Sequence, residues 1–255
     1  MKNTINESLK EVFKFITRPL SDETYLKLSY WMVMKKKLDL ENPITLNEKL
    51  QWIKLYNHNP LLTKYVDKYL VKDIVANVIG NEYIIPTLGV WKNFDDIDFS
   101  NLPSQFVLKC NHDSHSVIIC KDKDKFNYRE ARKKLDSSLK KNYYWHGREW
   151  AYKNVSPCII AEKYMSDNDQ TSELTDYKFY CFGEYVDSVM LCIDRDIGDP
   201  KFYFFDKNWE LRRYNLRGKE APKGFTLPKP PRMNEMFELA SKLSSFTKAP
   251  FVRVD

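Results

Sequence analysis

The sequence predicts an α+β fold in which a helical region precedes strands that are at least partly antiparallel. Three observations predict it. The first eighty residues show helical periodicity and a helix-capping motif. After Gly80 the pattern changes to short runs of β-branched and aromatic residues bounded by turn residues. Two links between these runs, at 182–184 and 206–208, have the composition of hairpin turns, which join antiparallel strands.

The helical region contains three identifiable segments. Residues 22–38 are rich in aromatic residues and leucine, and Thr45-Leu-Asn-Glu48 has the pattern of a capping box, which predicts that a helix starts there. From 61 to 79 an apolar residue recurs at every fourth position. We therefore expect one continuous helix there, ended by Gly80.

The rest of the chain combines strands with two helices. We expect strands at 83–86, 105–110, 117–120, 158–165, 176–182, 185–193, 201–205 and 251–254. The helices are expected at 128–142 and 233–246. Hydrophobic residues make up 43% of the 255 residues and charged residues 30%, which indicates a folded protein and excludes disordered and collagen-like classes.

Charge and glycine content exclude several function classes. The net charge of +6 is below that of a dedicated nucleic-acid-binding protein, so we expect no nucleic-acid partner. The seven glycines form neither a G-x-G-x-x-G nor a G-x-x-x-x-G-K-[ST] motif. A Rossmann dinucleotide site and a Walker A loop are therefore excluded.

Cysteine usage and the lack of long apolar runs indicate where the protein resides. The five cysteines are widely spaced and form no C-x-x-C motif, so we expect no disulfide framework and a reducing compartment. No apolar run approaches the roughly 18 residues that span a bilayer, and the first residues lack the apolar core of a signal peptide. We therefore expect a cytoplasmic protein.

An apolar stripe at helical spacing marks the first twenty residues. It consists of Leu9, Val12, Phe13 and Ile16, with Lys10, Lys14 and Arg18 lying off the stripe. This pattern is typical of a helix packed on its own domain, which is the commoner case. It also suits a helix that rests on the anionic inner face of the membrane, and with it a peripheral membrane association.

The segment 105–120 has the order strand, polar loop, strand. Alternation along the first strand puts Lys109 and Val107 on the face opposite to the more apolar one. Buried lysines are rare unless they are paired. Lys109 therefore either extends to the edge of the sheet or faces an anion.

The loop at 111–116 offers many donors to phosphate oxygens. Its hydroxyls (Ser114 and Ser116), its amide, its imidazoles and its backbone N–H groups suit such a use, and the carboxylate of Asp113 opposes it. His112 and His115 flank Asp113 and offer a second interpretation, a zinc site. That signal is weak because no further ligand lies nearby in the sequence.

Two other strands carry charged pairs. Glu162 and Lys163 interrupt an apolar strand, where a solvated surface ion pair is the simplest interpretation. Arg253 and Asp255 share one face of a strand. Their pairing suits an oxyanion contact beside a metal ligand, and it suits an ion pair at a sheet edge equally well.

The order of these features resembles the ATP-grasp superfamily. More narrowly, the sequence is similar to the TupA-like branch, which is associated with bacterial cell-surface polysaccharide or teichuronopeptide biosynthesis. The motifs that carry the resemblance are Asp67-Lys-Tyr-Leu-Val-Lys72, Ile85-Pro-Thr-Leu-Gly-Val-Trp91, Leu102-Pro-Ser-Gln-Phe-Val-Leu-Lys-Cys-Asn-His112, Gly147-Arg-Glu-Trp150 and Asp176-Tyr-Lys-Phe179. The resemblance covers about residues 45–255.

The resemblance implies a nucleotide clamped between two α+β lobes, at 81–157 and 158–255, after a helical region at 1–80. It implies a ligase in which ATP activates a carboxylate as an acyl phosphate that an amine then attacks. The partners would be carboxylate and amine substrates, either small molecules or glycans, and the cofactors would be ATP and Mg²⁺.

The resemblance also implies roles for individual residues. For nucleotide binding these are Lys109 and Lys68 at the phosphates, Ser114 and Ser116 in the phosphate loop, and Glu162 with Lys163 as the hinge against the adenine. For catalysis they are Lys178 at a phosphate, Arg253 at the oxyanion of the tetrahedral intermediate and Asp255 at magnesium. These types fit phosphoryl transfer, which needs cations to neutralise developing charge.

The sequence departs from the family pattern at two places. The family usually has His-Gly-Ser-Gly-Ser where this chain has His112-Asp-Ser-His-Ser116, so flexible glycines are replaced. The family also continues beyond Arg-x-Asp into a strand with a Glu that completes the magnesium site, whereas the sequence stops at Asp255. The second departure favours one alternative to the ligase, a catalytically impaired nucleotide-binding protein. The pathway context of the family allows another, a glycosyltransferase, for which the nearest D-x-D motif is at 194–196.

Overall fold

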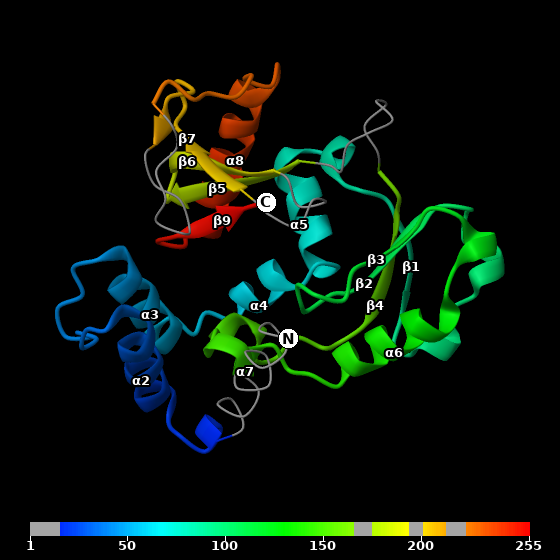
Figure 1. The fold of residues 1–255 in the computed structure, drawn as a ribbon, viewed down its shortest axis with the longest axis horizontal. Coiled ribbons are helices and arrows are strands. Elements are labelled where there is room, and N and C mark those ends of the chain that lie inside the picture. Colours follow the sequence, from blue (N-terminus) through cyan, green and yellow to red (C-terminus); the bar gives the residue numbers. More distant parts are fainter. Residues whose placement is uncertain (1–15, 166–174, 194–200, 213–222) are drawn as a thin grey trace. The chain divides into compact units, whose positions relative to one another are not determined.

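The computed structural model describes residues 16–165, 175–193, 201–212 and 223–255 (Figure 1). The chain divides into two compact units, each built from two separate stretches. Unit 1 takes residues 1–72 and 85–164, and unit 2 takes residues 73–84 and 165–255. Each unit holds one antiparallel sheet together with helices, so the α+β class is confirmed.

The first helices of unit 1 start at side-chain caps. Helix α2 (Asp22–Met34) begins where the Ser21 hydroxyl accepts the N–H of Thr24. Helix α3 (Leu46–Tyr56) begins at the predicted capping box, in which Thr45 Oγ1 accepts the N–H of Glu48 and Glu48 Oε2 accepts the N–H of Thr45 at 2.8 Å. Such caps satisfy N–H groups that have no partner inside the helix.

The helix predicted at 61–79 is two helices, so that prediction was wrong. Helix α4 (Leu61–Val66) ends at Asp67, whose φ of −77° and ψ of 111° are extended. The buried carboxylate of Asp67 accepts the N–H groups of Tyr69 and Leu70, and α5 (Leu70–Ile79) starts there. Apolar periodicity continues through the break and hides it. The predicted stop at Gly80 is confirmed, with a φ of +114° that favours glycine.

The sheet of unit 1 has the strand order β1-β4-β2-β3. Its strands are β1 (Thr87–Trp91), β2 (Phe106–Cys110), β3 (Ile118–Cys120) and β4 (Ile159–Lys163). Helix α6 (Tyr128–Leu139) packs Ala131 and Leu135 against the face that carries Phe106, Leu108 and Ile159. A short helix, α7 (Tyr144–Gly147), precedes β4.

The strand predicted at 83–86 is not formed. A 3₁₀ turn covers Asn81–Tyr83, and β1 begins only at Thr87. Pro86 has no N–H to donate to a ladder, so the strand begins after it.

The sheet of unit 2 has the order β8-β7-β6-β5-β9. Its strands are β5 (Asp176–Phe182), β6 (Tyr185–Ile193), β7 (Lys201–Phe205), β8 (Leu211–Arg212) and β9 (Val252–Val254). Helix α8 (Met233–Thr247) packs Phe237 against Phe179 of β5. Both predicted hairpins are confirmed, and Gly183 turns the first with a φ of +61°. Strand β8 was not predicted because two residues carry no periodicity.

Among the described helices, none is long and apolar enough to cross a membrane. The apolar stripe predicted near the start of the chain lies mostly outside the described residues, and its last member, Ile16, is exposed. The D-x-D motif at 194–196 also lies outside them.

All five cysteines are free, which confirms that the chain has no disulfide framework. Burial raises the pKa of the Cys110 and Cys181 thiols to about 11 and that of Cys158 to about 12. The thiolate is the reactive form, so at pH 8 about one in a thousand of the Cys110 and Cys181 thiols is ionised.

We predict that iodoacetamide at pH 8 leaves Cys110 and Cys181 unmodified in the native protein and modifies all five cysteines in urea. Peptide mass spectrometry after a timed quench measures both. Rapid modification of Cys110 in the folded protein would contradict the burial described above.

Candidate active site

The face of the unit 1 sheet that points away from α6 carries a charged group among apolar side chains. Strand pairing aligns Ile119, Val107, Glu162 and Thr87 in one row across four strands. Lys109 lies two residues beyond Val107 on β2, so it shares this face and is diagonal to Glu162. The alternation predicted for Lys109 and Val107 is thereby confirmed.

Glu162 lies between two lysines. Its Oε2 is 2.5 Å from Nζ of Lys109, and its Oε1 is 2.6 Å from Nζ of Lys72, near the start of α5. The side chains are 6% (Glu162), 19% (Lys109) and 14% (Lys72) exposed. We call these three residues the Glu162 triad.

The Glu162 triad holds more positive than negative charge. Two ammonium groups and one carboxylate sum to +1 at a site that is largely closed to water. Lys72 has a full set of acceptors, because its Nζ also donates to the Ile85 carbonyl at 2.8 Å and to Thr87 Oγ1 at 2.9 Å. For Lys109, Glu162 is the single hydrogen-bond or ion-pair partner among the described residues. An uncompensated positive charge at a site that is largely closed to water favours the binding of an anion.

Lys68 reaches this region from the break between α4 and α5. It lies in a turn and not in the continuous helix predicted for 61–79. Its ammonium donates to the backbone carbonyls of Asn111 and Asp113, in the loop after β2. Burial lowers the pKa of Lys68; the carboxylate of Asp113 opposes this effect and the charge of Lys109 adds to it. Lys68 thus fixes the backbone of the loop, and its two carbonyl partners are neutral.

The loop at 111–116 uses most of its own polar groups. Ser116 is buried, and its hydroxyl accepts the N–H of Cys110 and donates to Asp113. The other oxygen of Asp113 accepts the hydroxyl of Ser138 on α6. The carboxylate of Asp113, which was expected to oppose phosphate binding, therefore accepts hydrogen bonds from two hydroxyls. Ser114, by contrast, is exposed.

The zinc interpretation of the loop is not supported. His112 is buried, and its Nε2 lies 3.2 Å and 3.0 Å from the carbonyl oxygens of Ser138 and Lys141. His115 is exposed. In the described part of the chain, no three His, Cys, Asp or Glu side chains are grouped as a metal site. His112 is a structural residue that joins the loop to α6.

Glu162 and Lys163 do not form the surface pair that composition favoured. Glu162 is buried in the Glu162 triad, and the Lys163 side chain is exposed. The N–H of Lys163 donates to the carbonyl of Pro86 at 3.0 Å. Since β4 ends at Lys163, the first main-chain groups beyond the ladder are those of Tyr164 and Met165.

A second charged cluster lies in unit 2, on β5 and β9. Nε and Nη2 of Arg253 lie 2.6 Å and 2.7 Å from the two oxygens of Asp255, and Nζ of Lys178 is 3.2 Å from Asp255. Lys178 is also 3.4 Å from Asp176. Among these four side chains, two cations face two carboxylates. The predicted roles of Lys178 and Arg253 remain predictions.

The predicted magnesium ligand, Asp255, does not fit a metal ion as the described residues stand. Both of its oxygens are held by cationic side chains, and a magnesium ion needs an octahedral set of oxygen ligands.

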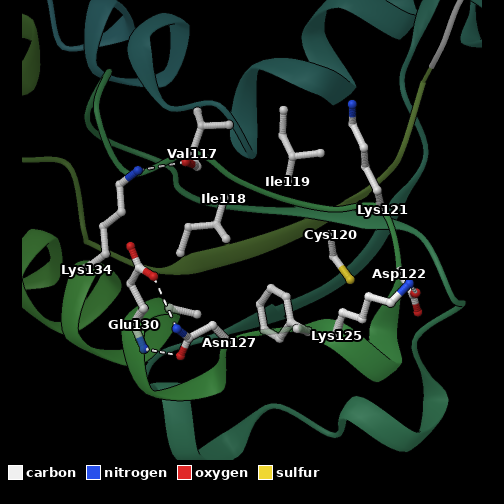
Figure 2. Close-up of a pocket in the computed structure, with 12 residues that line it drawn as sticks. Val117, Ile118, Ile119, Cys120, Lys121, Asp122, Lys125, Asn127, Glu130 and Lys134 are labelled. Atoms are coloured by element: carbon white, nitrogen blue, oxygen red, sulfur yellow. Dashed lines mark hydrogen bonds and ion pairs between the residues drawn. The ribbon is translucent and has the colours of Figure 1, made fainter.

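A separate hollow of about 520 Å³ lies between β3 and α6 in unit 1. Figure 2 shows Ile118 and Cys120 pointing into it, whereas Ile119 and Lys121 point to the other side of β3. Its lysines have polar partners: Lys134 donates to the carbonyl of Val117, and Lys125 is 2.9 Å from Asp122. No predicted site residue lines this hollow.

The role of Lys72 in the site was not predicted. Lys72 ends the motif at 67–72 and lies in the first turn of the apolar helix α5. A lysine at this position of a family motif was the available signal.

A family model described as TupA-like ATP-grasp matches residues 48–255. The chain belongs to the TupA-like ATP-grasp family. No curated protein matched the sequence. A solved structure, titled as that of the ATP-grasp ligase PsnB complexed with minimal precursor, is similar with a TM-score of 0.40 and 6% identity, over 81% of this chain. The match covers 55% of the PsnB chain, so this chain spans about half the length of that protein.

For this TupA-like ATP-grasp chain we predict that Glu162→Gln destabilises the fold by about 3 kcal/mol. The substitution leaves two lysines facing each other without the carboxylate that compensates them, and breaking a buried ion pair has a cost of this size. Urea unfolding measures it.

The matched control is Glu149→Gln, because Glu149 pairs with Lys54 at 3.7 Å and its side chain is 45% exposed. That substitution should change the free energy of unfolding by less than about 1 kcal/mol. Equal effects of the two substitutions would show that Glu162 does not compensate the lysines.

Proposed function

We propose that the chain binds ATP at the Glu162 triad and uses it to join a carboxylate to an amine. The observation that carries the proposal is the surplus positive charge of the Glu162 triad, in a chain of the TupA-like ATP-grasp family. Phosphate oxygens supply the missing negative charge. Val107 and the exposed Ile119, in the same row as Glu162, offer an apolar surface beside the lysine that suits a base.

The proposed reaction has two steps. A carboxylate oxygen attacks the γ-phosphorus of ATP, the bond to the β-phosphate oxygen breaks, and an acyl phosphate and ADP result. An amine then attacks the carbonyl carbon, an amide bond forms, and phosphate leaves. Positive side chains stabilise the charge that develops in both steps.

The residue roles follow the same proposal. Lys109 holds a phosphate, Lys68 fixes the loop at 111–116 around it, and the exposed Ser114 is the hydroxyl of that loop that remains accessible. Adenine recognition is proposed for the main chain of Tyr164 and Met165 and no longer for Glu162 and Lys163, because β4 ends at Lys163. Lys178 and Arg253 are proposed to act at phosphate and at the oxyanion. Magnesium would enter with the nucleotide phosphates.

The pathway is proposed from the family resemblance. The amide would be formed in bacterial cell-surface polysaccharide assembly, in the cytoplasm, on small-molecule or glycan substrates. The glycosyltransferase alternative rested on the D-x-D motif at 194–196, and no described residue favours it. A nucleotide-binding protein without turnover is distinguished by measuring ADP release with carboxylate and amine substrates present.

We predict that Lys109→Ala weakens ATP binding about 10- to 150-fold, which corresponds to the loss of a charged hydrogen bond worth about 1.5–3 kcal/mol. Titration calorimetry measures it. The fold should survive, because Glu162 keeps its ion pair with Lys72.

The control is Lys125→Ala, since Lys125 is 84% exposed. Its affinity for ATP should equal that of the wild type. A folded Lys109→Ala protein with unchanged affinity would remove Lys109 from the site.

We also predict that ATP binds more tightly than GTP, UTP or a UDP-sugar in parallel titrations. Main-chain groups at a strand end present a fixed pattern of donor and acceptor that suits one base edge. Equal affinity for all four would contradict base recognition there, and a preference for the UDP-sugar would favour the transferase.

A further inference from the structure

The end of α2 exposes an unusual run of side chains. Trp31, Met32, Val33 and Met34 are 55%, 43%, 78% and 38% exposed, and the three lysines that follow are exposed as well. We call residues 31–37 the α2 tip. Successive helical residues are about 100° apart, so apolar side chains occur on every side of this last turn.

The α2 tip adds no buried residue to the core of the described part of unit 1. That local core uses Tyr25, Leu26 and Tyr30 of α2 and then resumes with Leu38 and Leu40. The seven residues between Tyr30 and Leu38 are all exposed. Four of them in a row are large apolar side chains, and such exposed apolar surface is typical of a binding surface.

The neighbouring helix extends this apolar surface. Helices α2 and α3 contact each other and are joined by a loop (blue in Figure 1). Asn47 at the start of α3 contacts the sulfur of Met34, and Ile44 and Leu46 beside it are 74% and 43% exposed.

Positive charge borders the apolar surface. Lys35, Lys36 and Lys37 follow Met34 directly, and the Nζ of Lys35 lies 5.5 Å from the centre of the Trp31 ring. Two acidic residues nearby are turned toward the backbone. The carboxylate of Asp39 accepts the N–H groups at 41 and 42, and that of Glu48 accepts those at 44 and 45. Glu41 is the other acid of this loop.

We propose that the α2 tip docks on an anionic phospholipid surface. Trp31 and Val33 would enter the region between headgroups and acyl chains, where tryptophan is favoured, and the three lysines would meet lipid phosphates. A lipid surface fits better than a protein partner, because a helix end that is apolar on all sides suits a medium that surrounds it. A protein groove needs one apolar face.

This proposal is independent of nucleotide binding, since it uses none of the residues of the Glu162 triad. The apolar stripe in the first twenty residues also suited a membrane-associated helix. The present proposal places the membrane contact at the α2 tip instead.

The test is sedimentation of the full chain with vesicles. We expect binding to vesicles of phosphatidylglycerol mixed with phosphatidylcholine, weakening as salt is raised, and little binding to phosphatidylcholine alone. The substitutions Lys35→Gln, Lys36→Gln and Lys37→Gln together should weaken binding at least tenfold, and so should Val33→Asp. All replaced side chains are exposed, so the unfolding temperature should not change.

Matched controls replace the same residue types elsewhere. Lys125, Lys133 and Lys140, exposed on and near α6, are changed together to Gln, and the exposed Phe246 of α8 is changed to Asp. These variants should bind like the wild type.

Three results would overturn the proposal. One is equal binding of the α2-tip variants and the wild type, which would assign any membrane binding to another segment such as the first residues. Another is equal or absent binding to both vesicle types. The third is self-association that Val33→Asp abolishes in a chain that does not bind vesicles, which would identify the occupant as a second copy.

Discussion

The hydrogen bond between Asp67 and Asn111 is the constraint on which the candidate site depends. Both side chains are buried, and Nδ2 of Asn111 lies 2.9 Å from the Asp67 carboxylate. Asn111 also donates to the carbonyl of Ser156 and accepts the N–H of Cys158, just before β4. One amide thus ties the end of β2, the start of β4 and the link between α4 and α5 together. A buried network whose members are all satisfied fixes geometry in this way.

The two lysines of the Glu162 triad are not equivalent. Lys72 is held by a carboxylate, a carbonyl and a hydroxyl, whereas Lys109 has the carboxylate alone. If Lys109 were drawn to another anion, Lys72 would still compensate Glu162. In unit 2 the two cations Lys178 and Arg253 lie beside two carboxylates, those of Asp176 and Asp255. The surplus charge of the Glu162 triad supports the proposal of an anion site on the unit 1 sheet.

Sequence patterns predicted the regular elements well and the polar contacts poorly. Alternation placed Lys109 on the correct face, and the capping box located the start of α3, because both depend on residues close together in the chain. The break at Asp67 was missed because apolar periodicity continues through it, and because the Asp67 carboxylate that caps α5 is held by Asn111, 44 residues away. The same limit explains Glu162 and Asp113. Their partners Lys72 and Ser138 come from other elements, and local composition carries no signal for such pairs.

The division of the chain between the units has a consequence for the order of folding during synthesis. Residues 73–84 are made before the sheet of unit 1, yet they belong with residues 165–255. The Tyr83 hydroxyl, for instance, donates to Glu235 at 2.6 Å, and 152 residues separate the two. At the usual pace of about 5–20 residues per second, the ribosome needs roughly 8–30 s to make that stretch. During this interval the apolar side of α5 has no completed unit 2 to pack against, so its apolar side chains stay exposed until the later residues are made.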